Sequence, residues 1–189
     1  MEYFGKAMLA AVFCVVGAEN AAAQDASQWS GAYVGLTYAK GNLDQEYDDG
    51  GLFDLEGNGP GLVLGYNHGM GPWVFGGELA YSRVEIGQTD GDPFYFTSFL
   101  DLKARGGYAV DNLLLYATIG KTFSKWNEST ERFSGDGLLY GVGVDYMISS
   151  HFVVGGEYVM RDIQSEWNTS GDTFDADGGT LSVRASYKF

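Results

Sequence analysis

The chain ends in nine residues, Leu181-Ser182-Val183-Arg184-Ala185-Ser186-Tyr187-Lys188-Phe189, that decide how its fold is interpreted. Every second residue is apolar, and the residues between them are small or charged. Successive side chains of a β-strand point to opposite faces, so a period of two predicts a strand whose faces meet different surroundings. The apolar face carries Leu181, Val183, Ala185, Tyr187 and Phe189, and the other face carries Ser182, Arg184, Ser186 and Lys188.

The same alternation recurs in seven segments upstream, so the sequence predicts eight strands. They lie at 32–39, 62–67, 73–82, 99–108, 113–122, 138–146, 152–161 and 181–189. The connections alternate between short turns, near 68–71, 110–112 and 149–151, and long polar loops, at 41–57, 87–95, 125–136 and 164–178. This order is typical of an up-and-down antiparallel sheet, and an even number of strands lets the sheet close. We therefore predict an all-β fold, an eight-stranded antiparallel up-and-down β-barrel.

The charged residues of the predicted strands indicate which solvent the apolar face meets. A soluble barrel such as a lipocalin has its apolar residues inside and its charges outside. Here four acids and five bases share one face with glycine and serine, as expected of an enclosed polar interior. Tilted strands of about 9–11 residues cross a bilayer with their apolar side chains facing lipid. We favour this transmembrane barrel over a secreted soluble barrel.

We expect the interior charges to form a lumen charge network, because an isolated charge in a narrow barrel is costly. Glu78 is expected to pair with Lys103 or Arg105, and Glu157 with Arg184. The lumen of an eight-stranded barrel is just wide enough for side chains to fill it. We therefore interpret the network as a polar filling of the lumen that braces the wall. A conducting pathway gated by these pairs is the alternative. The predicted members are Glu78, Asp101, Lys103, Arg105, Asp145, Glu157, Arg161, Arg184 and Lys188.

Outward aromatic residues gather near both ends of the predicted strands. Those toward the short turns are Tyr66, Trp73, Tyr108, Tyr146, Phe152 and Phe189, and those toward the long loops are Tyr38, Tyr81, Phe96, Tyr140 and Tyr158. Two such belts are typical of the interfaces between a membrane and water.

The start of the chain has the order of a secretory leader. An apolar stretch at 7–18 follows Lys6 and leads into Ala21-Ala22-Ala23. The stretch is shorter than the roughly 18 residues of a membrane-spanning helix, and small residues before a cut are typical of a signal peptide. We predict a signal peptide over 1–23 and a barrel domain over 24–189. The only cysteine, Cys14, would leave with the leader, so no thiol would remain for a disulfide or a metal.

Composition excludes several classes of protein. The chain has 189 residues and a net charge of −14, which argues against nucleic acid as a partner, since binding to phosphates needs clustered bases. Hydrophobic residues make up 45% of the chain, which argues against disorder. The combination of 29 glycines, 3 prolines and 25 Tyr or Phe residues is typical of a β protein with many short turns.

At these residues the chain resembles the small outer-membrane β-barrel family that includes opacity-type surface proteins and OmpA-like eight-stranded barrels. The resemblance covers essentially the whole mature chain and is weakest in the long loops. The matching stretches begin at Trp29 (WSGAYVGL), Leu64 (LGY), Trp73 (WVFGGE), Ala104 (ARGGY), Leu115 (LYAT) and Val183 (VRASYKF). The last stretch is the most specific. Its final Phe189 shares one face with Tyr187, Ala185, Val183 and Leu181, which looks like the signal that the barrel-assembly machinery recognises.

The resemblance implies an integral outer-membrane protein without enzymatic activity or cofactor. We expect a structural and surface-interaction role in the cell envelope, and the alternative is a small porin for ions or small solutes. The implied partners are outer-membrane lipid, lipopolysaccharide, the barrel-assembly machinery and an extracellular ligand of the loops.

Two further sets of residues are candidates for chemical sites. Acidic residues crowd the first and last long loops, but Asp175-Ala-Asp177-Gly178 lacks a complete calcium-binding frame, so solvated loops are favoured over a metal site. A hydrolase acting on outer-leaflet lipid would need a histidine base near the long loops. His68 and His151 both fall in predicted short turns at the other end, so we assign no catalytic residue and no metal site.

Overall fold

The computed structural model describes residues 26–46, 52–87, 94–128, 131–166 and 173–189, and the predicted signal peptide lies outside them. A short 3-10 helix, η2 (Ala26–Trp29), precedes one antiparallel sheet. Its strands are β1 (Gly31–Glu46), β2 (Leu52–Met70), β3 (Trp73–Ser82), β4 (Glu85–Gly87), β5 (Phe94–Val110), β6 (Leu113–Glu128), β7 (Glu131–Met147), β8 (Phe152–Glu166) and β9 (Thr173–Lys188). The described part of the chain holds no helix that is long and apolar enough to cross a membrane.

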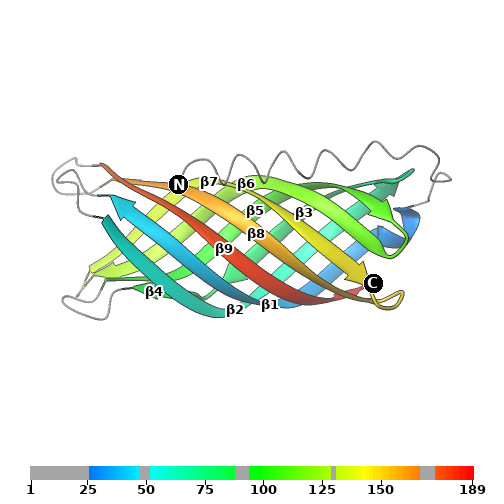
Figure 1. Cartoon of the computed structure of the whole chain (residues 1–189), viewed down its shortest axis with the longest axis horizontal. Helices are drawn as coiled ribbons and strands as arrows, with labels where there is room; N and C mark the ends of the chain where they lie inside the picture. The colour runs from blue at the N-terminus through cyan, green and yellow to red at the C-terminus, as the bar shows by residue number, and fades with distance from the viewer. Residues whose placement is uncertain (1–25, 47–51, 88–93, 129–130, 167–172) are drawn as a thin grey trace.

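The sheet closes into a barrel because its first and last strands pair (Figure 1). β1 runs antiparallel to β9, with Tyr33 opposite Lys188 and Tyr38 opposite Val183. β3 and β4 share one position, since both pair with β2 on one side and β5 on the other. The nine segments therefore make eight positions around the barrel, which confirms the predicted eight-stranded antiparallel barrel.

The interruption between β3 and β4 lies at Arg83 and Val84. The Arg83 N–H donates to the Pro60 carbonyl of β2 at 2.9 Å, and the Val84 side chain is buried. Gly59 permits this close approach, because a Cβ at that position would lie 1.8 Å from the Arg83 carbonyl oxygen. The wall stays continuous here, because β4 pairs with β2 in the same register as β3 does.

The short turns differ slightly from the predicted ones. The β2–β3 turn is Gly71-Pro72, and Gly71 has a φ of +58°, which glycine adopts without strain. His68 therefore lies within β2, opposite Phe75, because the ladder continues to Met70. His151 does lie in the turn between β7 and β8.

The long polar connections are shorter than predicted. The β1–β2 ladder continues to Glu46 opposite Leu52, β6–β7 to Glu128 opposite Glu131, and β8–β9 to Glu166 opposite Thr173. The strands thus run well beyond the 9–11 residues or so that cross a bilayer. These extensions lack the apolar alternation that identified the strands in sequence, so the sequence analysis assigned them to loops.

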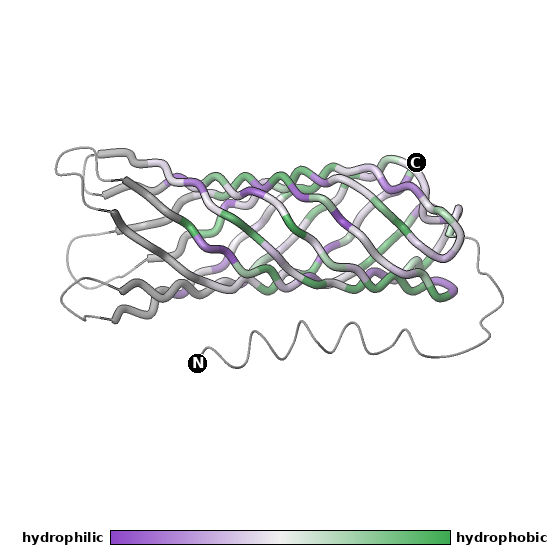
Figure 2. The backbone as a smooth tube through the Cα atoms, turned by 90° about the horizontal axis from the view of Figure 1, so that it is seen from above, coloured by the Kyte–Doolittle hydropathy of each residue, from purple (hydrophilic) through white to green (hydrophobic). Residues whose placement is uncertain are grey.

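The alternation divides the wall as predicted, with apolar residues outside and charges inside. Leu64, Leu102 and Val183 are each more than half exposed on the outer face, whereas Glu78 and Arg184 are 2% and 6% exposed. Figure 2 shows hydrophobic and hydrophilic residues alternating along the coloured part of the strands. This distribution is that of a barrel whose outer wall faces lipid.

Outward aromatic residues form the two expected belts. Trp73 and Tyr81, at the two ends of β3, are both exposed. They are eight residues apart on a strand that rises about 3.4 Å per residue, which gives roughly 21 Å along the axis for a tilt of about 40°. This separation is close to the height of the apolar band of a membrane barrel. The side chain of Phe96 lies outside the described residues.

A charge on the middle of the outer wall should destabilise the barrel in lipid. We expect Leu102→Arg to lower the free energy of unfolding by about 2–4 kcal/mol in phospholipid bilayers, because the guanidinium must enter hydrocarbon. Met70→Arg, at the exposed end of β2, should cost about 0–1 kcal/mol. Denaturant unfolding in vesicles measures both values, and equal costs would contradict a lipid-facing wall.

Candidate functional site: the lumen charge network

The inward face of the barrel concentrates buried charges near the middle of the wall. Eight of the nine predicted residues are buried, namely Glu78 on β3, Asp101, Lys103 and Arg105 on β5, Asp145 on β7, Glu157 and Arg161 on β8, and Arg184 on β9. Inward placement follows from the pleat, which sends every second residue of each strand into the lumen. We call these eight residues the lumen charge network.

Three cationic side chains form salt bridges with the Glu78 carboxylate. Its carboxylate lies 2.5 Å from Lys103 Nζ, 2.8 Å from Arg184 Nη1 and 3.3 Å from Arg105 Nη1. The Tyr33 hydroxyl donates to the same carboxylate at 2.6 Å. Sequence reasoning expected Glu78 to pair with Lys103 or Arg105, and the structure contains both pairs and a third.

Asp145 and Glu157 also have cationic partners across the lumen. Asp145 accepts from Arg105 at 2.8 Å and from Arg184, and Lys103 donates to Glu157 at 2.6 Å. The expected pair of Glu157 with Arg184 is replaced by these contacts. The long Arg184 side chain on β9 reaches across the barrel to β3 and β7, although Glu157 lies on its neighbouring strand.

Tyr116 is a member of this site that the sequence did not identify. The Arg105 guanidinium carbon lies 3.9 Å from the centre of its ring, and Arg184 donates to its hydroxyl at 2.7 Å. Gly143 on β7 provides the space, because a Cβ there would lie 2.2 Å from the Tyr116 hydroxyl. A tyrosine opposite a glycine on the inward face is the sequence signal that could have indicated this packing.

A second cluster lies toward the long loops. Arg161 Nη2 donates to Asp101 at 2.6 Å, and its Nη1 donates to the Thr180 hydroxyl at 2.8 Å. Asp101 also accepts from the Thr122 hydroxyl at 2.6 Å, and the Arg161 guanidinium lies 5.0 Å from the centre of the Phe99 ring. Both ions of this cluster are therefore compensated within the lumen.

The network is electrically neutral. Its eight members are four carboxylates and four cations. Burying a charge is strongly unfavourable unless an opposite charge and hydrogen bonds compensate it, and each carboxylate here has a cationic partner. This arrangement braces opposite sides of the wall and can hold them at a fixed separation.

Lys188, the ninth predicted member, lies outside this network. Its side chain is half-buried at the short-turn mouth, where its ammonium donates to the Ser30 carbonyl at 3.1 Å. The strand ends there, so an inward direction at Lys188 leads to the mouth of the barrel and not to its middle.

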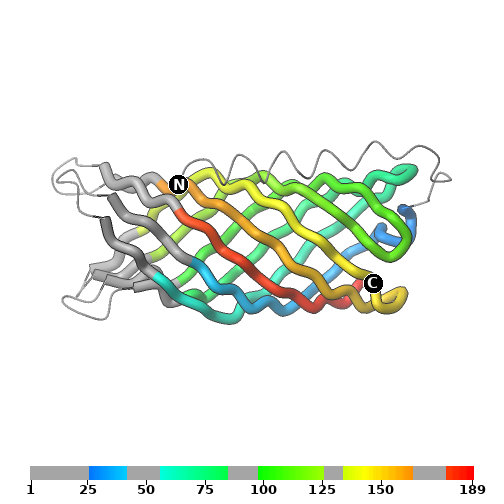
Figure 3. Tube along the Cα trace, in the orientation of Figure 1, coloured from blue at the N-terminus to red at the C-terminus, as the bar shows by residue number. Residues whose placement is uncertain are grey.

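Trp29 closes that mouth, a feature that the sequence did not predict. The helix η2 lies at the short-turn end (Figure 3), and Trp29 is 1% exposed. It packs in an apolar cluster with Ala26, Val74, Ala109, Leu114, Tyr116, Met147 and Val153. The sequence signal for this closure was Trp29 itself. It lies just before the first strand and is not part of the alternating pattern, so the pattern did not indicate where its side chain packs.

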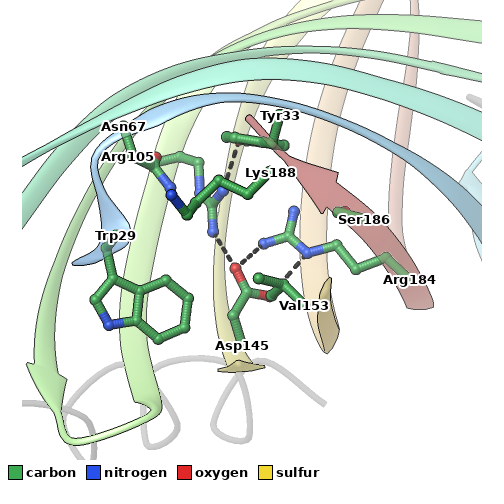
Figure 4. A pocket seen from close by; sticks show the side chains of 9 residues that line it. All are labelled: Trp29, Tyr33, Asn67, Arg105, Asp145, Val153, Arg184, Ser186 and Lys188. Carbon is green, nitrogen blue, oxygen red and sulfur yellow. Dashed lines mark hydrogen bonds and ion pairs between the residues drawn. The ribbon is translucent and has the colours of Figure 1, made fainter. Parts of the chain in front are cut away.

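A small cavity separates Trp29 from the charge network (Figure 4). The volume that it offers to water is about 20 Å³, and its walls include Tyr33, Arg105, Asp145 and Arg184. In this view Arg105 and Arg184 approach Asp145 from opposite sides. The lumen is thus filled here to within roughly one water molecule.

The C-terminal strand places its apolar set on the outer face. Leu181, Val183, Tyr187 and Phe189 are exposed, and the Phe189 N–H donates to the Ala32 carbonyl of β1 at 2.9 Å. Phe189 therefore lies at the seam where the barrel closes. Recognition of these residues by the assembly machinery stays a prediction.

The described side chains offer little for metal or hydrolytic chemistry. No group of three or more His, Cys, Asp or Glu among them could hold a metal ion. The side chains of Asp175 and Asp177 lie outside the described residues. Ser150 and His151 are 2.8 Å apart, but they are chain neighbours on an exposed turn, where His151 stacks on Tyr187.

Comparison with solved structures finds the same barrel. The attachment invasion locus protein Ail of Yersinia pestis is 20% identical, with 85% of this chain and 99% of that chain covered and a TM-score of 0.58. Neisserial surface protein A is 16% identical, with 85% and 98% covered and a TM-score of 0.64. OprG of Pseudomonas aeruginosa is 14% identical, with 85% and 96% covered and a TM-score of 0.52. At these identities the likeness shows the fold alone.

The sequence itself identifies the family. No curated protein matches the chain. The family model of the outer membrane protein beta-barrel domain matches residues 10–189. Because that match spans nearly the whole chain and the described residues close into the corresponding barrel, the protein belongs to the outer membrane beta-barrel family and is an integral protein of the outer membrane.

Proposed function

We propose that this protein is a closed barrel that stabilises the outer membrane and presents its loops to the outside, and that it is neither a channel nor an enzyme. The observation that carries this proposal is the neutral lumen charge network, in which every carboxylate is paired and the space between the network and Trp29 offers water only about 20 Å³. A conducting pore needs a continuous water path, and paired side chains fill the lumen of a barrel of this size.

Three successive layers support a closed lumen. The cluster around Trp29 fills the short-turn mouth, and the charge network fills the middle. Phe99, Leu139 and Ile163 are buried on the side of the long loops. A solute would therefore meet an apolar layer on each side of a salt-bridged centre.

The long loops would face the outside of the cell, because membrane barrels have short periplasmic turns and longer extracellular loops. The segments at that end, 40–58, 83–97, 121–136 and 162–177, contain seventeen acidic and five basic residues. Since the network is neutral, most of the net charge of −14 lies here. A surface of this sign favours cationic partners, or divalent ions shared with anionic lipopolysaccharide.

This charge argues against one class of extracellular ligand. Ail has been solved in complex with the heparin analogue sucrose octasulfate. A polyanion of that kind would be repelled by an end with twelve more acids than bases. Any extracellular ligand of these loops should accordingly have a different chemistry.

Neither histidine supports hydrolysis of outer-leaflet lipid. His68 and His151 are exposed at the short-turn end, far along the barrel from the proposed extracellular loops. A general base has to lie within hydrogen-bond reach of the reacting group.

The two ends of the chain have separate proposed roles in export and assembly. We propose that residues 1–23 are removed on export and that the terminal strand is the assembly signal.

Electrical recording tests the closed lumen directly. We expect the purified protein to give no stable single-channel current in planar bilayers, because the described lumen is filled with paired charges. Glu78→Ala should admit at most irregular current, since it removes the partner of three cations. A steady ohmic conductance of the wild type that Glu78→Ala changes would establish the porin alternative instead.

A substitution of Glu78 also tests whether the lumen charge network stabilises the barrel. Glu78→Gln should lower the free energy of unfolding by about 3–5 kcal/mol, because it leaves buried cations without compensation. Glu56→Gln is the matched control, since Glu56 pairs with Lys40 at 3.3 Å on the exposed surface and should contribute less than about 1 kcal/mol. Urea unfolding in detergent micelles measures both, and a small cost at Glu78 would show that the network does not brace the wall.

The assembly role of the terminal strand is tested in cells. Phe189→Ser should reduce the amount of protein in the outer membrane severalfold, while the purified chain refolds in detergent as well as the wild type. Phe152→Ser is the control, because Phe152 is an equally exposed aromatic residue at the same end. Immunoblots of outer-membrane fractions give the amounts, and equal losses for both variants would assign Phe189 to the aromatic belt alone.

A further inference from the structure

An open cavity of about 290 Å³ lies at the short-turn mouth of the barrel. Segments that are far apart in the sequence form its walls, namely η2, the turns that follow β5 and β7, and the end of β9. No member of the lumen charge network lines it, so the function proposed above does not account for this cavity. Its lining residues are Gln28, Asn112, Met147, Ser149, Ser150 and Lys188.

Hydrogen bonds between these segments hold the walls of the cavity in place. The Met147 N–H donates to the Asn112 carbonyl at 2.8 Å, and the Lys188 N–H donates to the His151 carbonyl at 2.7 Å. Gln28 Nε2 donates to a carbonyl of the β5–β6 turn at 2.7 Å. The cavity is therefore formed by contacts within the protein, which lowers the entropy that a ligand would lose on binding.

The side chains around the cavity can exchange hydrogen bonds with a polar ligand. The carboxamides of Gln28 and Asn112 and the hydroxyls of Ser149 and Ser150 can each donate and accept. All four residues are exposed, so a ligand can reach them from the solvent. Met147 is buried and adds an apolar contact. This lining suits a ligand that carries amide groups and a small apolar group.

Lys188 gives the cavity its charge preference. It is the only ionised side chain among the lining residues. Its ammonium donates to the Ser30 carbonyl at 3.1 Å and to the Phe189 main-chain oxygen at 3.4 Å, which leaves the third of its N–H donors for a ligand. Within the described part of the chain, no carboxylate side chain forms an ion pair with this ammonium. A carboxylate on the ligand would therefore gain a charge-assisted hydrogen bond.

The volume of the cavity limits the size of the ligand. Sites for small molecules measure about 300–1,000 Å³, so a cavity of about 290 Å³ lies at the lower end of that range. It suits one or two amino acid residues and excludes the interior of a long chain. A polymer would have to present an end group here.

We infer that this cavity binds the carboxylate end of a short N-acylated peptide, with the carboxylate on Lys188 and the amide groups on Gln28 and Asn112. This end group occurs in free peptides and in the stem peptides of peptidoglycan, both of which are found in the periplasm. Because short turns of membrane barrels face the periplasm, the inference rests on the orientation proposed above. It does not depend on whether the lumen conducts.

Nuclear magnetic resonance of the purified protein in detergent tests the role of the carboxylate. N-acetyl-alanyl-alanine and its C-terminal amide are titrated in turn, and the side-chain amide signals of Gln28 and Asn112 report binding. We expect the wild type to bind the amide about tenfold more weakly than the acid, whereas Lys188→Gln should bind both equally. No binding of the acid, or the same tenfold difference in Lys188→Gln, would overturn the inference.

Asn112→Asp is a second variant, which leaves the terminal strand unchanged. It adds a negative charge to an exposed lining residue and should weaken binding of the acid about tenfold, because like charges repel. Asn58→Asp is the matched control, since it adds the same charge at the long-loop end and keeps an acceptor for the Tyr38 hydroxyl. Equal losses for the two variants would assign the effect to net charge and overturn the inference. Circular dichroism checks that all variants have the wild-type β-sheet content.

Cosedimentation with purified peptidoglycan distinguishes the two sources of the ligand. Binding to peptidoglycan that Asn112→Asp reduces and Asn58→Asp does not would identify stem peptides as the ligand. Binding of the soluble acid without cosedimentation would identify free peptides. Failure of both ligands to bind would overturn the inference, and the single-channel recordings of the wild type would still test the closed lumen separately.

Discussion

Hydrocarbon offers no hydrogen bonds, and this constraint governs the whole molecule. Each backbone N–H and C=O in the membrane must find a partner within the protein, so a sheet has to close on itself. The pairing of β1 with β9 meets that requirement. Closure at eight positions then leaves an interior so narrow that side chains fill it, and any charge inside must be compensated by another.

The protein separates its charges accordingly. The interior is neutral, and its ion pairs and hydrogen bonds join side chains from β1, β3, β5, β6, β7, β8 and β9. Opposite sides of the barrel are thus connected through the lumen as well as around the wall. The strong negative charge is left for the end with the long loops, where water and ions can solvate it. In the function that we propose, the interior braces the wall and the exterior is available for recognition.

The helix η2 and its Trp29 complete this arrangement at the short-turn end. Trp29 covers the network from the short-turn side, and the paired charged side chains beneath it are at most 6% exposed. Excluding water strengthens the attraction between the paired charges, since the local dielectric is low. Apolar packing at the mouth and ion pairing in the middle support each other.

The sequence by itself determined the alternating part of each strand, the barrel and the face on which each charge lies, because the period of the pleat is local. It located Glu78 and Arg184 inside and Leu102 and Val183 outside without any knowledge of long-range contacts. Only the tertiary structure decided that Arg184 pairs with Asp145 and Glu78 in place of Glu157, and that Trp29 fills the mouth. These contacts cross the lumen, and their geometry is set by the stagger and curvature of the closed sheet, which no local pattern encodes.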